Sequence, residues 1–213
     1  MVFNYDPTLR AEQTDANAGS KTLRVDPDKQ VAVSRYISSP RNQQSDIIEA
    51  NITGAERLYL VVTNGGDGFD YDHADWATPV LIDEEGNETA LTALEWDANP
   101  VNGWNMNPRK GTNNDGNAMR IGGTTYNKGI GCNSPSQIVY TLPQGHHYVK
   151  FRSLVGFDDD VKGRSSGATM EFRIFTQDPA PSEEAEVTLD LAALGYAADE
   201  TVTITDMWTG QAI

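Results

Sequence analysis

The segment at 58–81, LYLVVTNGGDGFDYDHADWATPVL, constrains the fold of this chain most strongly. It opens with five apolar residues at 58–62, which predict a buried strand. Asparagine and two glycines at 64–66 then break that strand, because positive φ costs glycine little. A second short strand is expected at 79–82. The segment therefore predicts two strands joined by a polar, strongly acidic loop.

Short apolar runs separated by turn residues recur along the rest of the chain. The clearest predicted strands lie at 137–142, 148–155 and 169–175, and others are expected at 31–37 and 47–52. Nineteen glycines and ten prolines supply many turn positions. Short strands with frequent turn signals are typical of β-sandwiches. We therefore predict an all-β sandwich.

The charge balance limits the partners. The chain has 16 basic and 31 acidic residues and a formal net charge of −15. Nucleic acids and anionic membranes both need a basic face, so neither is an expected partner. No apolar run is long enough for membrane insertion. The first residues lack the pattern of a signal peptide, so we expect a mature chain or a fragment, and a single cysteine, Cys132, excludes an internal disulfide.

Two acidic clusters are candidate metal ligands. The first lies in the predicted loop beside His73, and the second is the run at 158–160. Carboxylates are preferred ligands of Ca²⁺, so we expect a structural Ca²⁺. The proposed ligands are Asp67, Asp72 and Asp158, with Asp70 and Asp75 as further candidates. Zn²⁺ would find only His73 and Cys132 as soft ligands. The alternative is that N–H groups satisfy these carboxylates without a metal.

The polar loop at 97–117, DANPVNGWNMNPRKGTNNDGN, is the candidate binding loop. Long loops that carry an aromatic residue among amides are more often functional than structural. An aromatic ring can stack on the apolar face of a sugar, and planar polar groups can bond its hydroxyls. The alternative is a loop pinned by a buried Trp104. The candidate sugar-binding residues are Trp104, Asn105, Asn107, Arg109, His73 and Trp96.

Three motifs together resemble a known family. They are GDGFDYDHADW at 66–76, NKGIGCNSPSQIVYTL at 127–142 and FRSLVGFDDD at 151–160. The set is similar to the NPCBM family of carbohydrate-binding modules, attached to bacterial glycoside hydrolases. The resemblance covers 31–177 and implies a jelly-roll β-sandwich of the galactose-binding type. The motif order is permuted, because DHADW normally closes the domain, and Cys132 stands where the family more often has Thr.

The flanks suggest the domain organisation. We expect an N-terminal flanking segment at 1–30, the sandwich at 31–177 and a linker at 178–186. The segment at 187–210, VTLDLAALGYAADETVTITDMWTG, resembles the β-domain that ends α-galactosidase-type glycoside hydrolases. Residues 187–213 would then be a fragment of that C-terminal domain, and the parent chain would carry the catalytic domain.

The resemblance implies a non-catalytic module that binds terminal galactose-type sugars. It also implies a secreted, periplasmic or cell-surface bacterial protein. One alternative is a structural spacer with no sugar site. A catalytic glycosidase domain is the other, but it needs two carboxylates at a defined separation, and no motif here marks such a pair.

Overall fold

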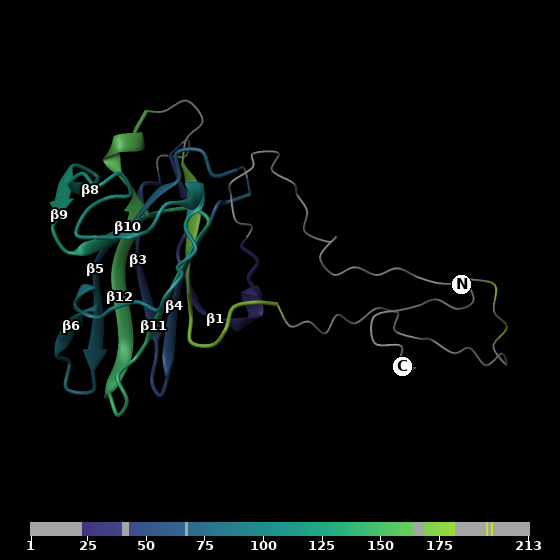
Figure 1. Cartoon of the computed structure of the whole chain (residues 1–213), viewed down its shortest axis with the longest axis vertical. Coiled ribbons are helices and arrows are strands. Elements are labelled where there is room, and N and C mark those ends of the chain that lie inside the picture. Colours follow the sequence, from purple (N-terminus) through teal and green to yellow (C-terminus); the bar gives the residue numbers. More distant parts are fainter. Residues whose placement is uncertain are drawn as a thin grey trace. The chain divides into compact units, whose positions relative to one another are not determined.

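The computed structural model describes residues 23–39, 43–66, 68–163 and 168–181, together with residues 195 and 197. Apart from the last two, these residues belong to one compact unit, Asp15–Pro181 (Figure 1). The predicted strands at 187–191 and 202–204 and most of the predicted flanks lie outside the described residues. The predicted boundaries at 31 and 177 therefore stay predictions.

Thirteen strands and four single-turn 3-10 helices make up the described part of the chain. The strands are β1 (Gln30–Val33), β2 (Ile37–Ser38), β3 (Ser45–Asn51), β4 (Arg57–Thr63), β5 (His73–Asp83), β6 (Glu88–Ala90), β7 (Arg109–Lys110), β8 (Met119–Ile121), β9 (Thr124–Tyr126), β10 (Gly129–Asn133), β11 (Ser136–Thr141), β12 (Tyr148–Phe157) and β13 (Thr169–Phe175). The 3-10 helices are η2 (Pro27–Lys29), η3 (Leu91–Ala93), η4 (Gly103–Asn105) and η5 (Asp159–Val161).

The strands form two antiparallel sheets packed as a sandwich, which confirms the predicted all-β class (Figure 1). The first sheet has the order β1-β13-β4-β11, with β2 also paired to β13. The second has the order β3-β12-β5-β10-β7, with β6 also paired to β5. A separate β8–β9 hairpin lies against the outer face of the second sheet, where Met119 and Ile121 pack on Ala77.

Alternating side chains from both sheets fill the space between them. Leu58, Leu60 and Val62 of β4 face this core, as do Met170, Phe172 and Ile174 of β13. Trp76 of β5 lies at the centre, with its ring edge-on to Phe172 at 4.9 Å. The period of two in these strands predicts which residues face the core.

The structure differs from the sequence-based prediction in the acidic motif at 66–76. Residues 73–78 were expected in a loop, but β5 already begins at His73. The reason is pairing on both sides, because β10 and β12 both bond to this part of β5. Ala74 and Trp76 then face the core, while His73 and Asp75 point to the outer face of the sheet.

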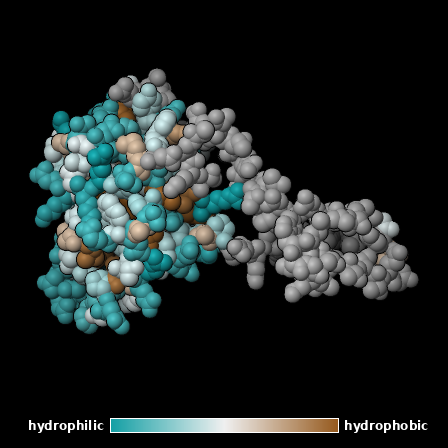
Figure 2. Space-filling view, in the orientation of Figure 1, coloured by the Kyte–Doolittle hydropathy of each residue, from teal (hydrophilic) through white to brown (hydrophobic). Residues whose placement is uncertain are grey.

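The outer face of the first sheet is partly covered by the chain that precedes β1. Leu23 and Val25 pack on Tyr59, Val61 and Phe175. The Asp26 N–H donates to the Pro179 carbonyl at 2.7 Å, so parts of both flanks pack on the sandwich. The visible surface is mostly hydrophilic, with small apolar areas (Figure 2). None of the described helices is long and apolar enough to cross a membrane.

Candidate functional site

Three loops meet at one end of the sandwich: the segment before β5, the η4 loop and the turn between β10 and β11. The buried Asn102 accepts a hydrogen bond from Asn133 N–H at 2.7 Å through its Oδ1. A Cβ on Gly103 would clash with the backbone carbonyl oxygen of Ser134, so only glycine allows this close approach. Asn133 Nδ2 in turn donates to the Phe69 carbonyl at 3.5 Å. The η4 loop is therefore held firmly against the end of the sheets.

Trp104 projects from this anchored loop. Its side chain is 50% exposed, and its ring packs edge-on against Phe69 with centroids 5.0 Å apart. Its backbone is left-handed, at φ 58°. Tyr71, two residues after Phe69, is 39% exposed and also left-handed, at φ 64°. This conformation costs a non-glycine residue about 1–2 kcal/mol, and such strain concentrates at functional sites.

The predicted polar partners of Trp104 belong to the same loop system. Asn107 and Arg109 are exposed, and the side chain of Asn105 lies outside the described residues. Arg109 Nε donates to the Asn114 carbonyl at 3.0 Å, and Asn102 Nδ2 donates to Asn114 Oδ1 at 3.3 Å. These bonds connect the Arg109 strand to the Trp104 loop. An exposed aromatic ring near amide and guanidinium groups can bind a polyhydroxylated ligand.

The other two predicted sugar-binding residues make different contacts. Trp96 packs partly on the core, edge-on to Tyr140 at 6.4 Å. Lys110 Nζ lies 5.0 Å from the centroid of the Trp96 ring, so a cation already covers that face. His73 lies in an acidic cluster, where its Nδ1 is 3.1 Å from both carboxylate oxygens of Asp160. Burial lowers the pKa of His73, but the Asp160 carboxylate outweighs it and leaves the pKa raised.

A row of small residues across the second sheet creates the space for this cluster. Asp75 of β5 is paired with Gly131 of β10 on one side and Gly156 of β12 on the other. A Cβ on Gly131 would lie 2.5 Å from Asn113 Cα, and one on Gly156 would lie 3.1 Å from Ile121 Cγ2 of the β8–β9 hairpin. The polar loop that carries Asn113 and the β8–β9 hairpin therefore pack directly on these strands. This close packing accounts for the glycines of the KGIG and GFDDD motifs.

Asp75 is the buried centre of the cluster. Its side chain is 0% exposed, and neither oxygen accepts a hydrogen bond from an N–H or O–H group of the described residues. Its strongest charged contact is with the carboxyl group of Asp158. Burial, followed by this contact, raises the pKa of Asp75 well above its ordinary value. A proton or a cation on Asp75 would remove the cost of burying its charge.

The acidic run at 158–160 ties the covering loop to the sheet. Asp158 accepts hydrogen bonds from Arg120 N–H at 2.8 Å and Asp160 N–H at 3.0 Å. Asp159 accepts from the N–H groups of Gly122 and Gly123, at 3.1 and 2.7 Å. Hydrogen bonds from N–H groups to these carboxylates are the alternative to a metal that the sequence left open.

The predicted metal ligands are only partly brought together. Asp72 is buried and accepts hydrogen bonds from Thr169 N–H at 2.9 Å and from the Ser134 hydroxyl, away from the cluster around Asp75. Asp70 is exposed, and Asp67 lies outside the described residues. Asp75 and Asp158 interact electrostatically with one another.

A different set of residues has the spacing of metal ligands. Ligand atoms of His73, Asp115 and Asp160 all lie within 4.8 Å of one another. Sequence analysis missed Asp115 because it lies in the polar loop, far along the chain from both acidic motifs. Its only local signal was an acidic residue within an Asn- and Gly-rich run.

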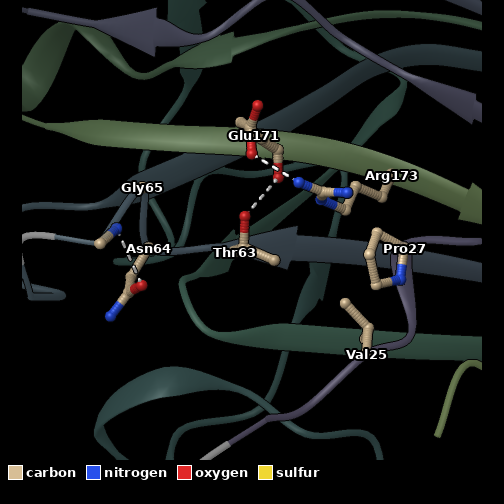
Figure 3. A pocket seen from close by; sticks show the side chains of 8 residues that line it. Val25, Pro27, Thr63, Asn64, Gly65, Glu171 and Arg173 are labelled. Carbon is tan, nitrogen blue, oxygen red and sulfur yellow. Dashed lines mark hydrogen bonds and ion pairs between the residues drawn. The ribbon is translucent and has the colours of Figure 1, made fainter. Parts of the chain in front are cut away.

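A small cavity lies elsewhere, beside the end of β4 on the first sheet (Figure 3). Its volume is about 230 Å³, and it is lined by residues of the segment before β1, the end of β4 and β13. None of the predicted site residues lines it.

A β-sandwich that presents an exposed aromatic ring among polar groups at one end has the features of a carbohydrate-binding module. The chain belongs to the NPCBM/NEW2 domain family, whose model matches residues 10–82 and 87–198. This is a family of carbohydrate-binding modules found in glycoside hydrolases. The permuted order of the motifs stays a prediction.

One curated relative is a Renibacterium salmoninarum protein named "Putative endo-alpha-N-acetylgalactosaminidase". The two sequences are 31% identical over 80 residues, which is 35% of this chain and 5% of the relative. The chain thus spans a small fraction of that protein. No solved structure gives a significant match.

Proposed function

We propose that this sandwich is a non-catalytic module that binds terminal galactose-type sugars of glycans through the Trp104 loop. The observation that carries the proposal is the half-exposed Trp104 ring, held in a strained backbone conformation on an anchored loop. A core residue would bury that ring, and a passive loop would place glycine or asparagine at this backbone position.

The chemistry of the loop suits a single sugar ring. The Trp104 face can stack on the apolar side of a galactose, where burial of aromatic area dominates the contact. Arg109 and Asn107, with Asn105, supply directional hydrogen bonds that distinguish an axial from an equatorial hydroxyl. A single ring buries little area, so we expect a Kd of roughly millimolar to tens of micromolar. Such weak binding is useful in a tethered module, because it raises the local concentration of the attached enzyme near its substrate.

We further infer that the module serves a larger bacterial glycoside hydrolase of the α-galactosidase type and acts outside the cell. The family and the name of the curated relative support an association with glycosidases. The absence of hydrolysis by the module itself is part of the proposal. In support, Asp72 and Asp158 are buried acceptors of structural hydrogen bonds, whereas hydrolysis needs a substrate-accessible pair of carboxylates. The second candidate function remains a structural spacer.

Calorimetric titration with galactosides tests the binding function. The parent chain should bind, and Trp104→Ala should abolish binding while the fold is retained. Ile47→Ala is a matched control, because Ile47 is also a large exposed apolar residue, on β3. Absence of binding across a galactoside panel would favour the spacer. Turnover of a chromogenic galactoside that is lost on replacing one acidic residue would show that the chain is catalytic.

We also propose that Ca²⁺ binds at the acidic cluster. The carboxylates of Asp75, Asp115, Asp158 and Asp160 supply the oxygen ligands that Ca²⁺ prefers. The support is the buried Asp75 carboxyl group, which receives no hydrogen bond from the described residues, and the close approach of Asp115 to Asp160. A chelator should lower the melting temperature, and added Ca²⁺ should restore it. Asp115→Asn should weaken this response and the control Asp70→Asn should not. An unchanged melting temperature would refute the metal.

A further inference from the structure

The cavity beside the end of β4 is built from three separate segments. Val25 and Pro27 come from the chain before β1, Asn64 and Gly65 follow β4, and Glu171 and Arg173 lie on β13 (Figure 3). These residues belong to the first sheet and its cover, whereas the Trp104 loop packs on the turn after β10. The cavity is therefore a separate feature that Trp104 does not line.

The polar lining is electrically balanced. Arg173 Nη2 lies 2.7 Å from Glu171 Oε2, and Arg173 Nη1 donates to Gln30 Oε1 at 2.5 Å. The two charged side chains are only 17% and 27% exposed. The buried Arg173 Nε has no hydrogen-bond partner among the described residues. Because the guanidinium and the carboxylate neutralise each other, the lining favours a neutral polar ligand over a free anion or cation.

The remaining walls fix the shape of the cavity. Gly65 and Gly66 both have positive φ, at 61° and 93°, and a Cβ on Gly65 would lie 2.8 Å from the Tyr36 hydroxyl. The Gly66 N–H donates to Asn64 Oδ1 at 3.2 Å, which holds the turn after β4. Val25 and Pro27 form an apolar wall in the close view (Figure 3).

The volume of about 230 Å³ is below the ~300–1,000 Å³ of pockets for drug-sized ligands. One six-membered ring with its hydroxyl groups is therefore a better match than an oligosaccharide chain.

We propose that this cavity is a second binding site, for one ring of a neutral polyol such as a terminal pyranose. Glu171 accepts hydrogen bonds from two neighbouring hydroxyl groups. Val25 and Pro27 contact the C–H face of the ring. The site would give the module two contacts with a branched glycan, and avidity would then exceed the affinity of either site.

Chemical-shift mapping of the whole chain with galactose tests the proposal. The Gly65 and Gly66 amides and the Arg173 Nε–H report on the cavity, and the Trp104 indole reports on the loop. The cavity signals should shift with galactose in the parent chain and equally in Trp104→Ala. Glu171→Gln should weaken the fitted cavity affinity about tenfold, as expected for loss of one charge-assisted hydrogen bond, and should leave the Trp104 titration unchanged.

Several results would overturn the cavity site. Unchanged cavity signals at saturating galactose would do so, whatever the Trp104 indole shows, and a shift of the indole alone would leave the loop site standing. If zwitterionic glycine shifts the cavity signals and galactose does not, the polyol assignment is wrong. Should Glu171→Gln fail to fold, the map of the parent chain and of Trp104→Ala still decides.

Discussion

The strained backbone of Trp104 allows its structural and binding roles to be separated by two substitutions. Trp104→Ala and Trp104→Gly both remove the ring, but alanine keeps the cost of the left-handed conformation at φ 58° and glycine relieves it. Loss of the ring should be equal in the two variants. Their difference in unfolding free energy therefore reports the backbone strain, reduced by the greater conformational entropy of glycine in the unfolded chain.

The magnitudes follow from the exposure of the ring. A tryptophan buries about 150–250 Å² when fully enclosed, so the half-exposed Trp104 buries roughly 100 Å². At about 25 cal/mol per Å² this contributes ~2.5 kcal/mol as an upper estimate. Trp104→Ala should lose up to that amount. Trp104→Gly should recover about 1 kcal/mol of it, so it should be the more stable of the two variants.

Urea unfolding and calorimetric titration with a galactoside provide the two measurements. Both variants should lose sugar binding, because the stacking face is gone. The parent chain should be the most stable, Trp104→Gly should be intermediate or close to the parent, and Trp104→Ala should be the least stable. If alanine equals or exceeds glycine in stability, the left-handed backbone is wrong. If either variant binds like the parent, the sugar does not stack on Trp104.

Three further predictions test other parts of the structure. Gly131→Ala should cost about 1–3 kcal/mol in chemical denaturation, because its Cβ would meet Asn113 of the covering loop, whereas Ala118→Gly, at an exposed position in that loop, should change stability little. Burial raises the pKa of Asp97, but hydrogen bonds from Arg57 and Thr141 outweigh it and leave the pKa lowered, so Asp97 stabilises the fold above about pH 3.8 and this contribution is lost as pH falls further. Asp97→Asn should reduce the loss of melting temperature in that acid range, and an unchanged acid profile would contradict the role of these bonds. Burial raises the pKa of Cys132 to about 12, so a thiolate-specific reagent at pH 8 should modify it no faster than the chain unfolds.

Local sequence pattern was enough to predict most of the strands. Residues 58–62 and 169–175 alternate or run apolar over the length of one strand, and the structure places them in β4 and β13. A buried strand needs only its own side chains and flanking turn residues to be recognised. The sequence did not decide the exposure of Trp104, because a loop pinned by a buried ring was left as an alternative, and the structure leaves the residue half exposed.

The acidic cluster and the cavity depended on pairing across distant parts of the chain. His73 and Asp75 were expected in a loop because they belong to the acidic segment that follows the strand break at 64–66, but β10 and β12 pair on both sides and present glycines there. The space above Gly131 and Gly156 then admits the loop that carries Asp115, which no local pattern could connect to Asp160. Likewise, Val25, Asn64 and Glu171 line one cavity only because β13 pairs with β4 and the chain before β1 packs over both. Strand register decides which side chains meet, and register is a property of the whole sheet.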